Sequence, residues 1–335
     1  MAIPAGTMAH THRILSGMRP TGKLHLGHLA GTLDNWIRLQ DEYDCFYMVA
    51  DWHALMGEYG DPARMREYAL DNVIDWLSCG IDPKRATLFV QSEVPAHLEL
   101  FMIFSCFTPL GWLERCPTYK EQLREVKTRD LHTYGFLGYP VLQAADILVY
   151  RADKVPVGED QLPHLELTRE IARRFNTLYK HEVFPEPDAI LTKAPRLPGL
   201  DGRKMSKSYN NTIDLSDNDE DIRKKVSAMI TDPQRIKLSD PGHPEVCSVF
   251  SYYAIFAAGE AGEAEGWCRN ARKGCTECKK ILAQRLIERL SPIHARRTEL
   301  ARDQDAIRKI LDDGREKAAA ACATTLSEVK KAMAL

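Results

Sequence analysis

The chain has 335 residues, of which 44% are hydrophobic and 27% charged, and its formal net charge is −2. This composition is typical of a soluble globular protein with one large or two ordinary domains. No apolar run reaches the roughly 18 residues of a membrane span. Residues 1–12 lack the apolar core of a signal peptide, so we expect a flexible leader and a cytoplasmic protein. Because the net charge is small, nucleic-acid binding would depend on local basic patches.

Hydrophobic patterning predicts alternating strands and helices at the start of the chain. Residues 13–17, 45–50 and 87–91 are short apolar runs typical of buried strands. Apolar residues recur at helical spacing over 24–39 and 64–77. This alternation predicts a doubly wound parallel α/β sheet, which binds ligands beyond the carboxyl ends of its strands.

The rest of the chain is expected to be mainly helical. Residues 96–175 form a helical insertion, 187–191 return as a strand, and 195–211 are a loop rich in Gly, Pro and Lys. The expected organisation is therefore a leader at 1–12, an α/β domain at 13–215 and an all-helical domain at 216–335.

The first motif with chemical content lies at residues 20–28, between the first strand and the first helix. His25 and His28 are three residues apart, and Gly27 between them permits close approach of a ligand. A helix N-terminus attracts phosphate, and imidazoles there can donate hydrogen bonds to phosphoryl oxygens. Considered alone, the pattern also fits two surface histidines on an ordinary helix.

The second motif is the loop at residues 202–208, which carries Lys204 and Lys207. Mobile cations beside a glycine suit a pyrophosphate leaving group, whose charge develops during the reaction. A solvated basic loop is the alternative interpretation. The combination of HLGH after a strand with KMSKS at 204–208 resembles the signature pair of class I aminoacyl-tRNA synthetases. Leu26 replaces the isoleucine that is usual in that family.

This resemblance implies a Rossmann-like nucleotide-binding sheet that uses ATP and Mg²⁺. Further segments resemble the tryptophanyl-tRNA synthetases in particular: 50–54, 139–148, 155–161, 164–169 and 232–233. Together these likenesses extend over most of residues 13–335. They imply activation of tryptophan to tryptophanyl-adenylate with release of pyrophosphate, and transfer of the tryptophanyl group to tRNA(Trp), by a homodimer.

Asp146 is the candidate that selects tryptophan. It lies within an apolar run, and a buried carboxylate can accept the single ring N–H of indole. An acceptor left without a partner would penalise substrates that lack this donor. A tyrosyl-tRNA synthetase and a non-catalytic paralogue that only binds RNA or a regulator are the alternatives. Intact HLGH and KMSKS motifs disfavour the paralogue.

The resemblance also implies the remaining site residues. The catalytic set is His25, His28, Lys204 and Lys207. The tryptophan contacts are Asp146, His53, Gln161, Leu15 and Gln143. The ATP contacts are Arg19, Pro20, Thr21, Gly27, His28, Gly158, Glu159, Asp160, Leu197, Lys204, Met205, Ser206, Lys207 and Ser208. Arg19 and Gln143 replace the glutamine and methionine that are commoner in bacterial relatives.

Nine cysteines in a cytoplasmic chain do not suggest a disulfide framework. Cys247, Cys268, Cys275 and Cys278 are close in sequence, and four thiolates suit either an iron–sulfur cluster or structural Zn²⁺. Four free thiols are the third alternative. Resemblance to a subset of bacterial tryptophanyl-tRNA synthetases implies a [4Fe–4S] cluster near the anticodon-binding surface.

Basic residues of the helical region are candidates for tRNA phosphate contacts, although a solvated helix face explains them equally well. They are Arg223, Lys224, Lys225, Arg272, Lys273, Lys279 and Lys280.

Overall fold

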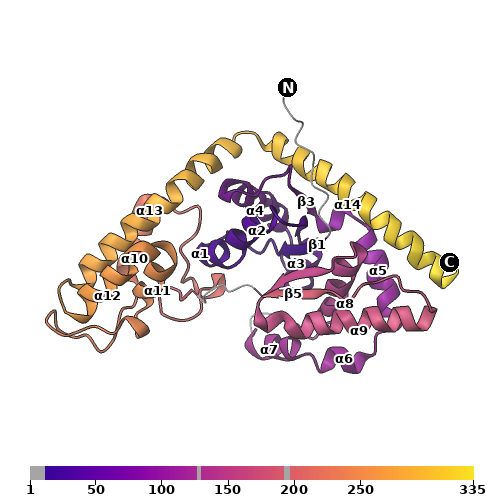
Figure 1. Ribbon diagram of the computed structural model, residues 1–335, viewed down its shortest axis with the longest axis horizontal. Coiled ribbons are helices and arrows are strands. Elements are labelled where there is room, and N and C mark those ends of the chain that lie inside the picture. The colour runs from indigo at the N-terminus through magenta and orange to yellow at the C-terminus, as the bar shows by residue number, and fades with distance from the viewer. Residues whose placement is uncertain (1–11, 127–129, 192–196) are drawn as a thin grey trace.

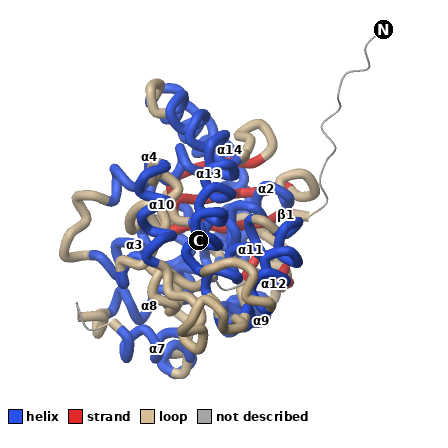
Figure 2. Tube along the Cα trace, turned by 90° about the vertical axis from the view of Figure 1, so that its left-hand side faces the viewer, coloured by secondary structure: helices blue, strands red, loops and turns tan. Residues whose placement is uncertain are grey.

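The computed structural model describes residues 12–126, 130–191 and 197–335. The predicted leader at 1–12 lies outside these ranges except for His12. A parallel sheet stands at the centre with helices on both faces, which confirms the predicted α/β fold (Figures 1 and 2). The strand order is β3-β2-β1-β4-β5. The strands are β1 (Arg13–Met18), β2 (Asp44–Val49), β3 (Ala86–Val90), β4 (Lys154–Val157) and β5 (Asp188–Leu191).

Side chains alternate between the two faces of the sheet, as the strand repeat requires. Ile14 and Tyr47 belong to a hydrophobic core formed with α2 (Asp34–Leu39) and α4 (Met65–Cys79). Their sequence neighbours Leu15 and Phe46 belong to the core on the opposite face. The helices of that face are α5 (Ala96–Ser105), α8 (Tyr134–Val149) and α9 (Leu162–Tyr179).

The sequence prediction missed β4, which lies between β1 and β5 in the sheet. It has four residues, and the second half contains Pro156, which lacks the N–H that a central strand normally donates. Parallel pairing with β5 joins Val155 to Ala189 and Val157 to Leu191. The strand is thus defined by its neighbours more than by its own sequence.

The first helix is divided into three segments where a single helix over 24–39 was predicted. The segments are α1 (Leu26–His28), a π-helical segment (Leu29–Leu33) and α2. The helix begins two residues later than predicted, because His25 serves as its N-cap. The next helices are α3 (Asp51–Glu58) and α4.

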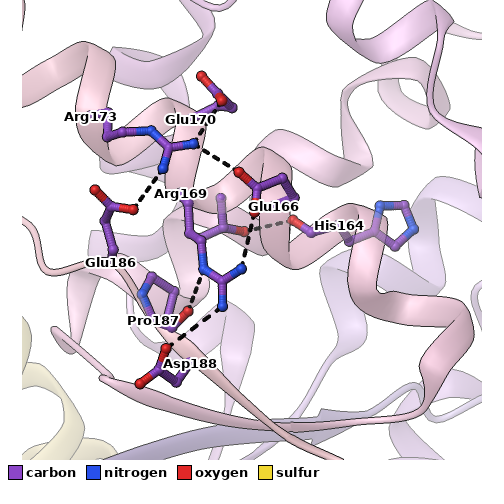
Figure 3. Close-up of polar contacts among 9 residues, drawn as sticks. His164, Glu166, Arg169, Glu170, Arg173, Glu186, Pro187 and Asp188 are labelled. Carbon is purple, nitrogen blue, oxygen red and sulfur yellow. Dashed lines mark hydrogen bonds and ion pairs between the residues drawn. The ribbon is translucent and has the colours of Figure 1, made fainter.

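The predicted helical insertion also contains α6 (Leu110–Glu114) and α7 (Pro117–Glu125). At its end, α9 is tied to the start of β5 by two arginines (Figure 3). Arg169 Nε donates to the Pro187 carbonyl oxygen at 2.8 Å. Arg173 Nη1 binds Glu186 at 2.7 Å. These contacts hold the outer helix against the edge of the sheet that carries β4 and β5.

The C-terminal region is helical, as predicted. Its helices are α10 (Asp219–Ala228), α11 (Ser248–Phe256), α12 (Ala261–Arg269), α13 (Cys275–Leu300) and α14 (Gln304–Met333). Short 3₁₀ turns occur at Gln91–Glu93, Glu159–Gln161, Lys207–Tyr209, Pro244–Val246 and Ala258–Glu260. None of the helices in the described ranges has the length and apolar character needed to span a membrane.

The last two helices form two long arms over the molecule (Figure 1). α13 packs with α10 and α11, whereas α14 runs back along β3 and α5. The contact is close at Gly314, where an added Cβ would lie 1.7 Å from the Leu88 carbonyl oxygen. Only glycine fits there, since any side chain would displace the strand. The final helix therefore packs on the α/β sheet.

Candidate active site

A cavity of about 390 Å³ lies at the carboxyl ends of β1 and β4. The strand order reverses between these two strands, and such a switch point is the usual ligand site of an open parallel sheet. Seven predicted site residues line the cavity: Leu15, Arg19, His53, Gln143, Asp146, Gly158 and Gln161. Both replacements noted in the sequence, Arg19 and Gln143, thus line this cavity.

Asp146 lies in α8, and only 1% of its surface is exposed. Its carboxylate is oriented by hydrogen bonds with three neighbouring side chains. Its Oδ2 lies 2.7 Å from His53 Nε2. Its Oδ1 accepts from Gln91 Nε2 at 2.8 Å and lies 2.7 Å from His97 Nδ1. Burial by itself would raise the pKa of Asp146, but the hydrogen bonds from His53 and His97 outweigh burial and lower it. The carboxylate is therefore ionised at neutral pH.

Sequence reasoning did not identify Gln91 and His97. Both are fully buried, and they do not line the cavity, whereas Asp146 and His53 do. Gln91 directly follows β3, so the rule that ligands bind beyond the carboxyl ends of strands could have indicated it. Nothing in the sequence distinguishes His97, which lies in the first turn of α5.

The predicted histidine pair is formed, with ring centroids 3.8 Å apart. His25 Nδ1 accepts from the Gly27 backbone N–H at 3.1 Å, and His28 Nδ1 accepts from the His25 backbone N–H at 3.1 Å. Burial lowers the pKa of His25 to about 4. Burial also lowers the pKa of His28 well below its ordinary value, and the neighbouring His25 and Lys207 add to this. Both rings are neutral, and because each Nδ1 accepts, each proton is on Nε2.

The two motifs are joined through backbone pairing of residues 24–26 with 213–215. The Leu26 N–H donates to the Ile213 carbonyl oxygen at 2.9 Å, and the Leu215 N–H donates to Leu24 at 2.9 Å. This pairing places the KMSKS loop beside the histidines. It is a long-range contact that neither motif predicts locally.

Lys207 and Lys204 have different surroundings. The Lys207 Nζ donates to the Gly22 carbonyl oxygen at 2.9 Å. Burial lowers the pKa of Lys207 to about 8, although Asp214 opposes this. Lys204 is exposed. Gly22 itself has φ +135°, a conformation that other residues rarely adopt, so the carbonyl that receives Lys207 depends on glycine.

Asn211 fixes the shape of the loop from behind, and sequence reasoning missed it. Asn211 is only 2% exposed. Its Oδ1 accepts from the Ser206 backbone N–H at 2.8 Å. Its Nδ2 donates to Asp201 Oδ1 at 2.7 Å and to the Lys204 carbonyl oxygen at 3.2 Å. Asn211 lies three residues after the KMSKS motif, and no pattern in the neighbouring sequence indicates its role.

The remaining predicted ATP residues lie on several elements. Leu197 and Met205 are buried and joined by a backbone hydrogen bond of 3.3 Å. Ser206 and Ser208 flank Lys207 in the loop. Glu159 and Asp160 are exposed in the 3₁₀ turn after β4. Pro20 and Thr21 precede the histidine motif, and Gly27 lies against the His25 ring.

The four cysteines of the predicted metal centre lie in or next to three helices. Cys247 precedes α11, Cys268 is near the end of α12, and Cys275 and Cys278 are in the first turn of α13. Burial, with smaller contributions from Cys247 and Cys268, raises the pKa of Cys278 to about 11. Nevertheless, within the described ranges no three His, Cys, Asp or Glu side chains are arranged to hold a metal ion.

A basic groove of about 420 Å³ lies between α10 and α13. Its lining includes Arg223, Lys279 and Lys280 from the predicted tRNA contacts. Two other predicted contacts bind carboxylates of this chain: Lys225 binds Asp217 at 2.6 Å, and Lys273 lies 3.4 Å from Glu277. In the groove, Arg223 donates to Gln284 and Lys279 donates to the Ser227 carbonyl oxygen, and neither of these partners is a carboxylate.

Comparison with known proteins agrees with this geometry. Residues 8–291 match the family described as tRNA synthetases class I (W and Y). The tryptophan–tRNA ligase of Thermotoga maritima is 51% identical over 326 residues, which cover 96% of this chain and 99% of that protein. The chain belongs to the class I tRNA synthetases of the tryptophan and tyrosine type. This confirms the family indicated by the HLGH and KMSKS motifs.

Two further proteins of the tryptophan type are similar to this class I synthetase. The tryptophan–tRNA ligase of Aquifex aeolicus is 44% identical, and the match covers 96% of this chain and all of that protein. The tryptophanyl-tRNA synthetase of Campylobacter jejuni, solved with ADP and tryptophan, superposes with a TM-score of 0.87 at 31% identity. That match covers 96% of this chain and 100% of the other.

Proposed function

We propose that this synthetase activates tryptophan with ATP and transfers the tryptophanyl group to tRNA(Trp). The observation that carries the proposal is the ionised carboxylate of Asp146 in the wall of the cavity. Tryptophan offers an indole N–H to such an acceptor. The tryptophan-type relatives that match nearly the whole chain support the same substrate.

The tryptophan subsite would use the predicted residues as follows. The indole N–H donates to Asp146 Oδ2, the oxygen that His53 also contacts. Leu15 contributes an apolar wall, and Gln143 and Gln161 offer polar groups to the amino and carboxylate end of the substrate. Phenylalanine would leave the carboxylate without its partner, which disfavours that substrate.

The ATP subsite would use neutral histidines and mobile lysines. The Nε2–H groups of His25 and His28 donate to phosphoryl oxygens, because their Nδ1 atoms already accept backbone hydrogen bonds. Lys204 and Lys207 neutralise the leaving pyrophosphate. Mg²⁺ would be held mainly by the phosphates and water. The adenosine contacts are proposed at Arg19, Pro20, Thr21, Gly27, Gly158, Glu159, Asp160, Leu197, Met205, Ser206 and Ser208.

The chemistry needs no covalent enzyme intermediate. The tryptophan carboxylate oxygen attacks the α-phosphorus, the bond to the bridging oxygen breaks, and pyrophosphate leaves with that electron pair. A ribose hydroxyl at the tRNA 3′ end then attacks the acyl carbon, loses its proton, and AMP leaves. Catalysis comes from positioning the reactants and stabilising charge on the phosphates.

Pyrophosphate exchange measured with each of the twenty amino acids tests this function. We expect incorporation of labelled pyrophosphate into ATP with tryptophan and essentially none with tyrosine or phenylalanine. Exchange with tyrosine alone would identify a tyrosyl-tRNA synthetase. No exchange with any amino acid would favour a non-catalytic paralogue.

For tRNA, we propose that phosphates bind the basic groove between α10 and α13. Lys280→Ala should raise the KM for tRNA, and the double variant with Lys279→Ala should raise it further. Each lost phosphate contact should also reduce the slope of log binding constant against log salt concentration by roughly one unit. Pyrophosphate exchange should be unchanged. Lys309→Ala, an exposed lysine on α14, is the matched control. Equal effects of the control and groove variants would contradict the proposal.

For the four cysteines, we propose a [4Fe–4S] centre, with structural Zn²⁺ as the alternative. Their spacing supports it, and so does the proximity of Cys247 to Cys268 and Cys278, which contributes to the raised pKa of both thiols. Binding would require the thiol side chains to rotate, since they do not yet form a ligand set. Protein purified without oxygen should carry about four irons per chain. One zinc per chain would support the structural Zn²⁺ site instead. Protein without metal would contradict both and show that the four cysteines are free thiols.

We also propose a homodimer in the cytoplasm. Light scattering of the purified protein would measure its mass in solution. A mass of 37.9 kDa, that of a single chain, would contradict the dimer.

A further inference from the structure

Behind the tryptophan subsite, a continuous set of buried polar contacts leads from Asp146 to the C-terminal helix. His97 Nδ1 is 2.7 Å from Asp146 Oδ1, and His97 Nε2 is 2.9 Å from the Tyr150 hydroxyl. Tyr150 is fully buried and interacts with Cys322 of α14. Gln91 makes the second contact to the same carboxylate oxygen at 2.8 Å.

The donor and acceptor roles along this path are determined by chemistry. Burial, with a further contribution from Cys322, raises the pKa of Tyr150 well above 10, so the phenol keeps its proton. The ionised Asp146 can only accept, so the proton of the His97 ring that faces it lies on Nδ1, and Nδ1–H donates to Asp146 Oδ1. Nε2 of the neutral ring is then an acceptor, and the Tyr150 O–H donates to it. Tyr150 thereby favours the same histidine tautomer that holds the carboxylate.

The two oxygens of Asp146 therefore have different partners. Oδ1 accepts hydrogen bonds from Gln91 and His97, which lie outside the cavity. Oδ2 contacts His53, which lines the cavity. With Oδ1 saturated by two donors, rotation of the carboxylate would break two buried hydrogen bonds. Oδ2 is therefore kept toward the substrate.

We propose that His97 and Gln91, with Tyr150 behind His97, are positioning residues that determine selectivity for the indole N–H. They act through Asp146 and do not touch the substrate. This inference rests on the proposed tryptophan specificity and deepens it. Discrimination between tryptophan and an isostere without the ring N–H thus depends on residues outside the cavity.

The test compares tryptophan with 3-(3-benzothienyl)alanine, in which sulfur replaces the ring N–H. The measured quantity is the ratio of kcat/KM for the two substrates in pyrophosphate exchange. His97→Leu should lower this ratio about tenfold or more, with the KM for ATP unchanged. His97→Asn, whose amide can replace the Nδ1–H donor, should restore much of it. Gln91→Leu should lower it as well.

Two further variants separate positioning from packing. Phe89→Leu alters the ring packing against His97 and Tyr150, which lie 5.9 and 5.6 Å away between ring centroids, without removing a hydrogen bond. It should slow both substrates equally. Tyr150→Phe removes only a hydroxyl and should lower the ratio about threefold by releasing the His97 tautomer. It therefore tests the path even if His97→Leu fails to fold.

An unchanged ratio in Tyr150→Phe, together with an unchanged ratio in Gln91→Leu, would overturn the inference. The same holds if Phe89→Leu lowers the ratio as much as the polar variants do. If the wild-type enzyme fails to activate tryptophan, the proposed function is what has failed. If wild type discriminates and Asp146→Asn does not, while these variants keep full discrimination, only the present inference is wrong.

Discussion

On the tryptophan side of the cavity, the carboxylate of Asp146 is buried and takes three hydrogen bonds from neighbouring side chains. On the phosphate side, Lys204 is exposed, and the Lys207 amine rests on the backbone carbonyl of Gly22. In the proposed function, the indole acceptor is thus arranged before substrate arrives. The cations would instead follow charge that moves to pyrophosphate during the reaction, which a long side chain on a loop can do.

The two sides also differ in how burial affects charge. Hydrogen bonds overcome the effect of burial at Asp146 and keep it ionised. At His25, His28 and Lys207, burial dominates and favours the neutral form. Consequently the indole side holds a fixed charge, whereas the phosphate side has two neutral donors and one lysine whose charge changes near physiological pH. The following variants test this contrast, in order of decreasing effect.

The largest effect is expected for Asp146→Ala. Loss of the acceptor, together with the unpaired donors of Gln91 and His97, should reduce kcat/KM for tryptophan by about 10³-fold or more. The KM for ATP should stay within about twofold. Steady-state exchange kinetics measure both. Asp313→Ala, an exposed carboxylate on α14, is the control. Retained tryptophan selectivity would show that Asp146 does not define the subsite.

Lys207→Ala should reduce kcat for exchange about 10²–10³-fold and leave tryptophan binding nearly intact, because the lysine stabilises developing charge. Its pKa of about 8 adds a pH test. The amine is charged below this pH and neutral above it, so kcat/KM for ATP should fall as pH rises through about 8. Lys207→Arg stays charged and should lose this alkaline fall. Equal losses in tryptophan binding and rate would contradict the assignment.

Asn211→Ala should reduce kcat about tenfold, since the loop that carries both lysines would lose the contacts to Ser206, Asp201 and Lys204 and become misplaced. Tryptophan affinity, measured by fluorescence titration, should be unchanged. Asn270→Ala removes a comparable side-chain to backbone hydrogen bond in α12 and should have no effect on exchange. A loss of tryptophan affinity would show that Asn211 supports the whole site instead of the loop.

The smallest effect concerns the histidines. With the pKa of His25 at about 4 and that of His28 well below its ordinary value, neither gains a proton near pH 6.5. The kcat/KM for ATP should therefore be flat between roughly pH 6 and 7. A fall in rate with a midpoint near 6.5 that disappears in His28→Asn would show that protonation of the pair matters after all.

Much of this protein follows from local sequence. Apolar runs identified four of the five strands of the described sheet, and helical spacing identified the helices at 24–39 and 64–77, because both patterns depend on neighbouring residues; α3 was not predicted. β4 escaped detection because four residues with a proline carry little strand signal. HLGH and KMSKS likewise named the phosphate-side residues, since each motif is a short segment whose chemistry is contained in its own residues.

Other features arise only when distant segments meet. Gln91 and His97 reach Asp146 from 55 and 49 residues away, and residues 24–26 pair with 213–215. The packing of α14 on β3 also cannot be predicted from the sequence of α14, although the close approach of the two elements requires the glycine at position 314. A hydrogen bond or close contact between separate elements depends on their relative positions, which burial of the shared cores establishes. Sequence therefore indicated the proposed reacting groups, and packing determined which side chains orient them.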